Sequence, residues 1–353
     1  MGSAETPYDL AKFRILMVHG FAQNGSQFRA KASRISNRIT QLLTPKILSE
    51  FPGRIEFLYP DAPLILEHPI GLGLNSVDRK EEQKNERQNF LPLGYEKEGF
   101  DLFGWWYGRD NVSRYRGIEA SLSYVATYIH GRPIHGILGF SQGGALAGMI
   151  SSLIDCSDNP EKIAAIRAQG LPVDDFLKLP AQKPLRCCIS IAGYMGTVRY
   201  YGSLYQWPIQ TPSVHALASM DAVVEHYGTV DLAECFSSYE IVQYHGSHFC
   251  PRDRLTVEAL AHFMLKNCWG NSAAPVLPQS IKMIDDEDWS DFGRKESGRS
   301  LSKRSDSVGS DKSAENSTIW RRHRKTFVTR GRCTPSMSPR RPIPASAQSY
   351  LRP

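Results

Sequence analysis

Short apolar runs alternate with stretches of helical spacing along the first 270 residues of the chain. Ile134–Leu138 is such a run, with proline before it and glycine after it, and its length favours a buried strand. Before this run, apolar residues at positions 118, 122, 125 and 129 have the spacing of a helix face. Strands that alternate with helices predict an α/β fold, with a mostly parallel central sheet and helices on both faces. Further strand candidates cover residues 13–20, 55–59, 185–192, 212–218 and 238–245.

The apolar pattern stops near Trp269, which sets the expected domain boundaries. We expect residues 1–11 to be a flexible N-terminus and residues 12–269 to be one domain, a normal size for a single α/β unit. Within it, residues 67–100 are highly charged and lack periodicity, which predicts a surface insertion or lid. Residues 270–353 are rich in serine, arginine and proline. We expect a disordered basic tail there, because such a composition buries too little apolar surface to fold.

The segment Gly139–Gly143 reads G-x-S-x-G and directly follows the apolar run 134–138. The residues after it are small and apolar, which predicts a helix packed closely on the sheet. A strand, a sharp turn and a helix are the context of a nucleophile elbow, which presents a serine hydroxyl at the carboxyl end of the sheet. Ser141 is therefore the candidate nucleophile, and the N–H of Gln142 is a candidate oxyanion donor. The competing interpretation is a glycine-rich turn in which Ser141 has no chemical role.

A serine hydroxyl needs a base to accept its proton, and in the α/β-hydrolase order an acid and then a histidine follow the serine. Asp221 comes just after the strand candidate 212–218, and His248 comes just after the candidate 238–245. The interval between them has room for one helix and one strand, the minimal step between parallel neighbours. The sequence therefore predicts Asp221 as the acid and His248 as the base.

Other residues compete for these two roles. His245 ends the strand candidate and is the alternative base, but His248 lies in the loop, from which a base can reach the serine. Asp221 also suits the N-terminus of a helix, a role that is compatible with catalysis. Asp231, at an expected helix start, and Asp253, which follows the histidine, are weaker acid candidates.

The loop after the first strand candidate holds a second group of candidate residues. Gly20 would let the backbone bend close to a substrate. In serine hydrolases of this fold a second oxyanion donor comes from such a loop, so we expect the N–H of Phe21 or Ala22 to supply it. His19 is interpreted as a buried residue that supports the loop, because His248 already fills the role of the base.

These motifs resemble the FSH family of eukaryotic serine hydrolases, which are small single-domain α/β-hydrolases. The resemblance spans roughly residues 12–267 and implies Ser141 as nucleophile, Asp221 as acid and His248 as base. The tandem tryptophans and the Gln-Asn-Gly loop favour this family over the acyl-protein thioesterases, which share Gly-Phe-Ser-Gln-Gly-Gly. Ser247 departs from the family, which usually has a second glycine at that position. The matching stretches are 18–25, 58–63, 105–107, 115–122, 136–145 and 246–251.

The excess of positive charge lies in the C-terminal tail. From Lys282 onward the chain has 16 lysines and arginines against 9 acidic residues, which leaves 26 against 27 for the remainder. The basic balance therefore says nothing about the substrate of the domain. The run Trp320–Lys325 is typical of segments that bind an anionic membrane, RNA or a protein such as an import receptor. The alternative is a solvated tail without a partner.

Cysteine and histidine usage indicates neither a disulfide framework nor a metal site. The seven cysteines include no C-x-x-C pair, and the adjacent Cys187 and Cys188 should point to opposite faces of a strand. We expect reduced thiols, no metal, no cofactor and no transmembrane segment, since no apolar run approaches about 18 residues. The start of the chain has no signal-peptide core, so we expect a cytoplasmic protein, with the nucleus as an alternative or additional location.

The sequence as a whole predicts a serine hydrolase that cleaves a small acyl ester or thioester through an acyl-enzyme on Ser141. One alternative is a thioesterase that releases an acyl or polyketide chain from a carrier protein. A second alternative is a non-catalytic scaffold that docks through its basic tail. The presence of serine, acid and histidine in the expected order argues against the scaffold.

Overall fold

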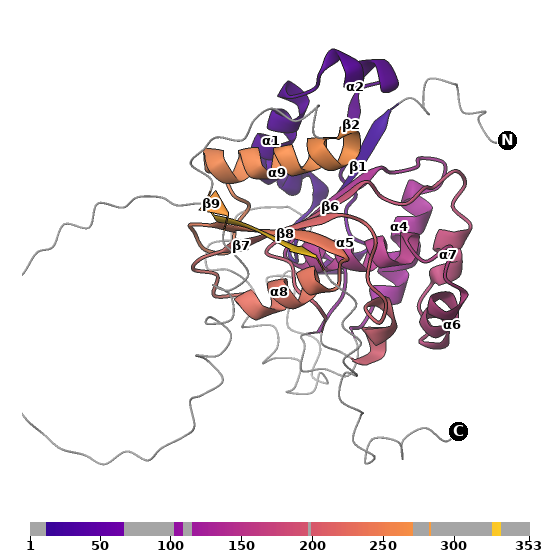
Figure 1. Cartoon of the computed structure of the whole chain (residues 1–353). Coiled ribbons are helices and arrows are strands. Elements are labelled where there is room, and N and C mark those ends of the chain that lie inside the picture. The colour runs from indigo at the N-terminus through magenta and orange to yellow at the C-terminus, as the bar shows by residue number, and fades with distance from the viewer. Residues whose placement is uncertain are drawn as a thin grey trace, which may run out of the picture.

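The computed structural model describes residues 12–66, 102–108, 115–196, 199–270, 282–283 and 327–332. The expected N-terminal segment 1–11 and the expected insertion 67–100 lie outside the described residues. The described part of the chain has a central sheet between two layers of helices, as Figure 1 shows.

Six strands of the central sheet run parallel to one another. They are β1 (Phe13–Val18), β2 (Ile55–Leu58), β5 (Gly136–Phe140), β6 (Cys187–Ile191), β7 (Ser213–Ala218) and β8 (Ser238–Tyr244). Their order is β2-β1-β5-β6-β7-β8, and each of the five pairings is parallel. A separate antiparallel pair consists of β3 (Leu64–Leu66) and β4 (Leu102–Gly104). The prediction of a mostly parallel sheet in an α/β-hydrolase fold is confirmed.

Helices cover both faces of the sheet, as the alternating pattern predicts. One face carries α1 (Gly25–Gln41), α2 (Pro45–Glu50) and α9 (Arg254–Trp269). The other carries α4 (Ile118–Ile129), α5 (Gln142–Ile154), α6 (Pro160–Ala168), α7 (Val173–Leu177), α8 (His226–Glu234) and the 3₁₀-helix η2 (Arg199–Leu204). Asn24 begins α1 with a reciprocal cap to Gln27, and α9 ends at Trp269, where the apolar pattern stops.

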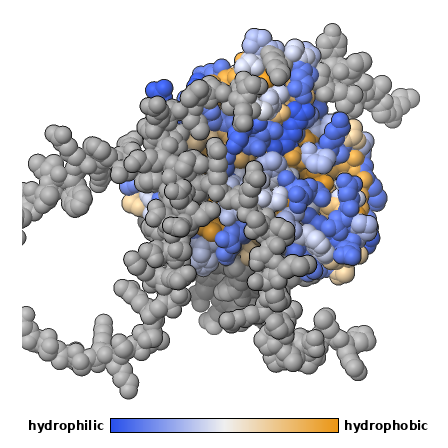
Figure 2. Space-filling view, in the orientation of Figure 1, coloured by the Kyte–Doolittle hydropathy of each residue, from blue (hydrophilic) through white to orange (hydrophobic). Residues whose placement is uncertain are grey.

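The core divides into two clusters, one on each face of the sheet. Alternation along β1 places Leu16 in one cluster and Met17 in the other. Cys187 and Cys188 are divided in the same way, so the prediction that they face opposite sides of the strand is confirmed. Figure 2 shows one face of the molecule, where hydrophilic side chains surround scattered hydrophobic ones, and the large apolar side chains are mostly inside.

Helix α5 lies unusually close to the sheet, and all of its residues are buried. A Cβ atom on Gly143 would lie 2.1 Å from the carbonyl oxygen of Val18, and one on Gly144 would lie 2.8 Å from the Cα of Gly193. Only glycine fits at these positions. The small residues after the candidate elbow therefore allow the helix to pack directly on the strand backbones, as the sequence indicates.

Two short pieces of the expected tail are strands at the edge of the sheet. β10 (Phe327–Arg332) pairs antiparallel with β8 along six residues, and β9 (Lys282–Met283) pairs with β10. For these residues the structure differs from the expected disorder. Composition measures how much apolar surface a segment can bury, whereas a strand can be held by backbone hydrogen bonds to an otherwise unpaired edge. The rest of the tail, including Trp320–Lys325, lies outside the described residues.

Replacement of Gly143 by alanine should destabilise the protein. The new Cβ would meet backbone at 2.1 Å, so α5 must move away from the sheet, and we expect a loss of about 2 kcal/mol or more in the free energy of unfolding. Gly202→Ala is the matched control, because a Cβ there meets nothing within 4 Å, and its effect should be within about 0.5 kcal/mol. Urea denaturation measures both, and equal stabilities would contradict the close packing of α5.

Candidate active site

The segment Gly139–Gly143 forms the sharp turn that the sequence predicts. β5 ends at Phe140, α5 begins at Gln142, and Ser141 between them has φ +54° and ψ −120°. A Cβ on Gly139 would lie 2.0 Å from the carbonyl oxygen of Gly143, so the turn tolerates no side chain there. A positive φ is strained for serine and persists only when the surrounding packing enforces it. The strand–turn–helix context of a nucleophile elbow is therefore present.

Three side chains from separate loops meet at this turn. The Ser141 Oγ lies 2.8 Å from Nε2 of His248, and Nδ1 of His248 lies 2.8 Å from Oδ2 of Asp221. Asp221 follows β7 and His248 follows β8, so both reach the carboxyl edge of neighbouring parallel strands. The two loops are also joined by backbone, since the N–H of Met220 donates to the carbonyl of Gly246 at 2.9 Å. The structure thus brings together the three residues that the sequence singles out.

The carboxylate of Asp221 is buried and uses both of its oxygens. Its side chain is 2 % exposed, and Oδ1 accepts hydrogen bonds from the N–H groups of Val223 and Val224. Burial by itself raises the pKa of Asp221, but the hydrogen bond to His248 and the two backbone N–H groups lower it below its usual value. Helix α8 starts later and has Glu225 as its N-cap, so Asp221 is not the cap of that helix.

The competing residues lie elsewhere. His245 is exposed, and its Nδ1 lies 3.4 Å from the Oγ of Ser219. Asp231 lies within α8, and Asp253 caps α9 by accepting the N–H of Thr256. His245 and Asp253 thus have partners other than Ser141, whose Oγ lies beside His248. Their exclusion leaves the predicted serine, histidine and aspartate as the connected set.

His19 is a structural residue of the loop that faces the elbow. Its Nδ1–H donates to the carbonyl of Gly20 at 2.7 Å, and its Nε2 accepts the N–H of Ala62 at 2.9 Å. The ring is fully buried, and this burial lowers the pKa of His19 to about 4. The interpretation of His19 as a support for the loop agrees with these contacts. Ala22 in the same loop has φ +55°, which turns the chain sharply.

The side chain of Gln142 has a role that the sequence reading missed. Its Oε1 accepts the N–H of Trp105 and its Nε2 donates to the carbonyl of Trp106, both at 2.9 Å. Trp105 in turn donates its indole N–H to the carbonyl of His19 at 2.8 Å. Both tryptophans are fully buried, so they belong to the core rather than to an open pocket. The adjacent tryptophans were the available signal for this link.

Exposed apolar side chains lie next to the acid and the base in the chain. We call Met220, Val223 and Phe249 the apolar rim; they are 55 %, 63 % and 39 % exposed. Met220 and Val223 belong to the loop of Asp221, and Phe249 directly follows His248. Large apolar side chains that remain in water beside a polar site are candidates for contact with an apolar ligand.

Over residues 12–270, apart from the gaps given above, no group of three or more metal-binding side chains occurs. No helix in that part of the chain is long and apolar enough to cross a bilayer. The six described cysteines form no disulfide and are buried, and burial raises the pKa of Cys250, two residues after His248, to about 12.

The α/β-hydrolase fold and a serine at a strained elbow define a serine hydrolase, and comparison with known proteins agrees. A family model described as "Serine hydrolase (FSH1)" matches residues 8–260. The chain belongs to this family, as its motifs indicate. It is also 25 % identical to esterase OVCA2 of Danio rerio over 249 residues, which cover 67 % of this chain and 90 % of that protein.

The chain is also similar to two proteins that differ from it in length or in their described activity. It is 22 % identical to a dihydrofolate reductase of Schizosaccharomyces pombe over 252 residues, which cover 71 % of this chain but only 46 % of that relative, about half its length. Among solved structures, Zea mays acyl-protein thioesterase 2 superposes with a TM-score of 0.43 and 17 % identity, covering 73 % of this chain and 94 % of that one.

Low pH should destabilise the folded protein because His19 is buried in its neutral form. The folded-state pKa of His19 is about 4, below the value of about 6.5 in an unfolded chain, so the unfolded state binds more protons between these values. The stability contributed by neutral His19 is therefore complete above about pH 6.5 and is lost as the pH falls toward 4. Replacing His19 by glutamine should make the free energy of unfolding depend less on pH in this range.

Urea denaturation between about pH 7 and pH 4.5 measures this effect. His130→Gln is the control, because His130 is exposed at the end of α4, and its profile should follow that of the native chain. A His19→Gln profile as steep as that of the control would show that the ring does not stay neutral in the folded loop.

Proposed function

We propose that the protein hydrolyses carboxylic esters or thioesters through an acyl-enzyme on Ser141. The observation that carries the proposal is the continuous set of 2.8 Å hydrogen bonds from Ser141 through His248 to Asp221, at a serine held with positive φ. A nucleophile, a base and a group that orients the base, each within hydrogen-bond reach of the next, are the arrangement that activates a hydroxyl.

In this mechanism His248 acts as the base. Its Nε2 accepts the proton of the Ser141 hydroxyl while Oγ attacks the acyl carbon, and the resulting imidazolium donates that proton to the departing alcohol or thiol. Asp221 receives the Nδ1–H of His248, which fixes the tautomer that leaves Nε2 free to accept. The lowered pKa of Asp221 keeps its carboxylate charged opposite the imidazolium.

The negative oxygen that forms on the acyl carbon needs N–H donors. The N–H of Gln142 is one candidate, because it begins α5 and has no intrahelical acceptor. The second candidate is the N–H of Phe21 or of Ala22, in the loop that His19 supports. Each such donor is worth about 3 kcal/mol of transition-state stabilisation. The hydrogen bonds from the Gln142 side chain through Trp105 to His19 would hold the two donors in fixed positions relative to each other.

Water completes the reaction by attacking the acyl-enzyme. His248 accepts a proton from that water and returns it to Oγ of Ser141, and a carboxylic acid leaves. The apolar rim supports an apolar acyl chain as the part of the substrate that lies against the protein, since burial of each methylene contributes about 0.8 kcal/mol. Esters and thioesters share every step described here, so the choice of leaving group is a matter for direct comparison.

Replacement of Ser141 by alanine should abolish hydrolysis and labelling by a fluorophosphonate. One hydroxyl is lost at a buried turn, so the fold should remain, whereas the rate should fall by about 10⁴-fold or more. The assay uses nitrophenyl esters and matched thioesters of equal acyl length, which also ranks the two leaving groups. Labelling of the alanine variant at the native level would refute Ser141 as the nucleophile.

The two histidines of this region provide the paired control. His248→Ala should lose as much activity as Ser141→Ala, because a nucleophile and its base act as a unit. His245→Ala should retain activity within a fewfold factor, since the His245 side chain is exposed and contacts Ser219 rather than Ser141. The opposite result would assign the base to His245.

The apolar rim should favour longer acyl chains. Substitution of both Met220 and Val223 by serine removes two exposed apolar side chains, so kcat/KM for an octanoyl ester should fall by about tenfold, while that for an acetyl ester should change by less than about twofold. Leu177→Ser is a control at an exposed apolar residue on α7. Equal losses for the acetyl and octanoyl esters would show that the rim does not contact the acyl chain.

A further inference from the structure

A polar cavity lies at the far end of α5 from Ser141. Its volume is about 270 Å³, near the lower end of the roughly 300–1,000 Å³ that is usual for small-molecule sites. Asp155 ends α5, and thirteen helical residues separate it from Ser141, which is about 20 Å of helix. The cavity is therefore distinct from the candidate active site.

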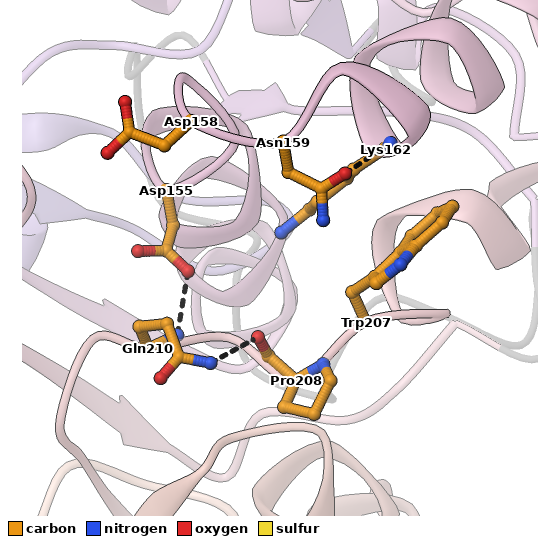
Figure 3. Close-up of a pocket in the computed structure, with 7 residues that line it drawn as sticks. All are labelled: Asp155, Asp158, Asn159, Lys162, Trp207, Pro208 and Gln210. Atoms are coloured by element: carbon orange, nitrogen blue, oxygen red, sulfur yellow. Dashed lines mark hydrogen bonds between the residues drawn. The ribbon is translucent and has the colours of Figure 1, made fainter.

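The most unusual group in this cavity is the ammonium of Lys162. The lysine is only 2 % exposed, and Figure 3 shows its side chain extending into the space between Asp155 and Trp207. Among the described residues, no hydrogen bond or ion pair within 4.0 Å engages this ammonium. The side chain is thus buried while its ammonium faces the cavity, whereas buried lysines normally have a carboxylate or another acceptor beside them.

The position of Lys162 in the first turn of α6 makes its positive charge still less favourable. Asn159 caps α6 by accepting the N–H of Lys162, the third residue of the helix, and the positive end of the helix dipole disfavours an ammonium there. Burial lowers the pKa of Lys162, and the charge of Asp155 only partly offsets this. The side chain of Lys162 lines the cavity, and an anionic group placed there would pair with its ammonium.

The opposite wall of the cavity is acidic. Asp155 and Asp158 both line it, and Asp155 accepts the backbone N–H of Gln210 at 2.7 Å. A simple anion beside Lys162 would be repelled by these two carboxylates, whereas a simple cation would give the lysine no partner. A ligand with one positive and one negative group avoids both the repulsion and the missing partner. The half-buried indole of Trp207 provides an apolar surface beside the charged groups, as Figure 3 shows.

We propose that this cavity binds a small zwitterion of the α-amino-acid type. The carboxylate of the ligand pairs with Lys162, its ammonium lies toward Asp155 and Asp158, and its side chain lies against Trp207. The site goes beyond the proposed hydrolase function, since none of these residues touches Ser141, Asp221 or His248.

Titration calorimetry on the full chain with three matched probes tests this assignment. L-Phenylalanine carries both charges, 3-phenylpropionate carries only the carboxylate, and 2-phenylethylamine carries only the ammonium. L-Phenylalanine should bind with a Kd below about 1 mM, and each of the other probes should bind at least about tenfold more weakly. Ser141→Ala should bind L-phenylalanine like the native chain, which separates this site from the candidate active site.

Two variants identify the residues that bind the probe. Lys162→Met keeps the length of the side chain without its charge, so it should weaken L-phenylalanine binding by about tenfold or more without lowering the melting temperature or ester hydrolysis. Lys178→Met is the control at an exposed lysine and should bind normally. Asp158 is exposed, so Asp158→Asn tests the acidic wall even where Lys162→Met affects folding, and we expect weaker binding by about fivefold.

Several outcomes would overturn the proposal. Equal binding of 3-phenylpropionate and L-phenylalanine would indicate an anion site, and equal binding of 2-phenylethylamine would indicate a cation site. Absence of binding up to about 10 mM L-phenylalanine would mean that the cavity does not accept this class of ligand. Unchanged binding by both Lys162→Met and Asp158→Asn would place the bound probe elsewhere on the protein.

Discussion

The close approach of α5 to the sheet is the constraint on which the candidate site depends. A Cβ on Gly143 would meet the backbone of Val18 in β1 and one on Gly144 would meet that of Gly193 just after β6, so the helix begins almost in contact with the sheet. The chain must therefore reverse from β5 into α5 within one residue, and Ser141 takes a strained φ of +54°. Burial of all of α5 stabilises this arrangement, because the apolar surface of a whole helix outweighs the strain at one residue.

Behind this turn, polar groups connect the loops that the mechanism requires. The Gln142 side chain binds the backbone of both tryptophans, and Trp105 binds the loop at His19. Asp221 also connects two loops, since its buried carboxylate accepts hydrogen bonds from two backbone N–H groups of its own loop and from the ring of His248. Buried polar groups that are fully hydrogen-bonded fix a single geometry, whereas incomplete ones destabilise it. Hydrogen bonds thus hold the loops on both sides of Ser141.

Lys162 of α6 contrasts with Asp221 of the candidate active site. Both are buried charges, but Asp221 has three hydrogen bonds and Lys162 has none among the described residues. The pKa of each group moves accordingly: hydrogen bonds lower the pKa of the carboxyl, which keeps it charged, and burial lowers the pKa of the ammonium, which disfavours its charge. The carboxylate of a ligand bound in the cavity would give the ammonium of Lys162 a partner, which it lacks among the described residues.

The sequence by itself determined the sheet, the family and the residues that meet at the site. The strands can be recognised as apolar runs and the elbow as a five-residue motif, because both depend on residues that are close together in the sequence. The sequence also favoured His248 over His245, but only the tertiary structure joined Gln142 to the tryptophans and placed β10 on the edge of β8. It also revealed the cavity at Lys162, which a lysine in the first turn of a short helix does not indicate. These features depend on which segments meet in space, and a local pattern carries no information about distant partners.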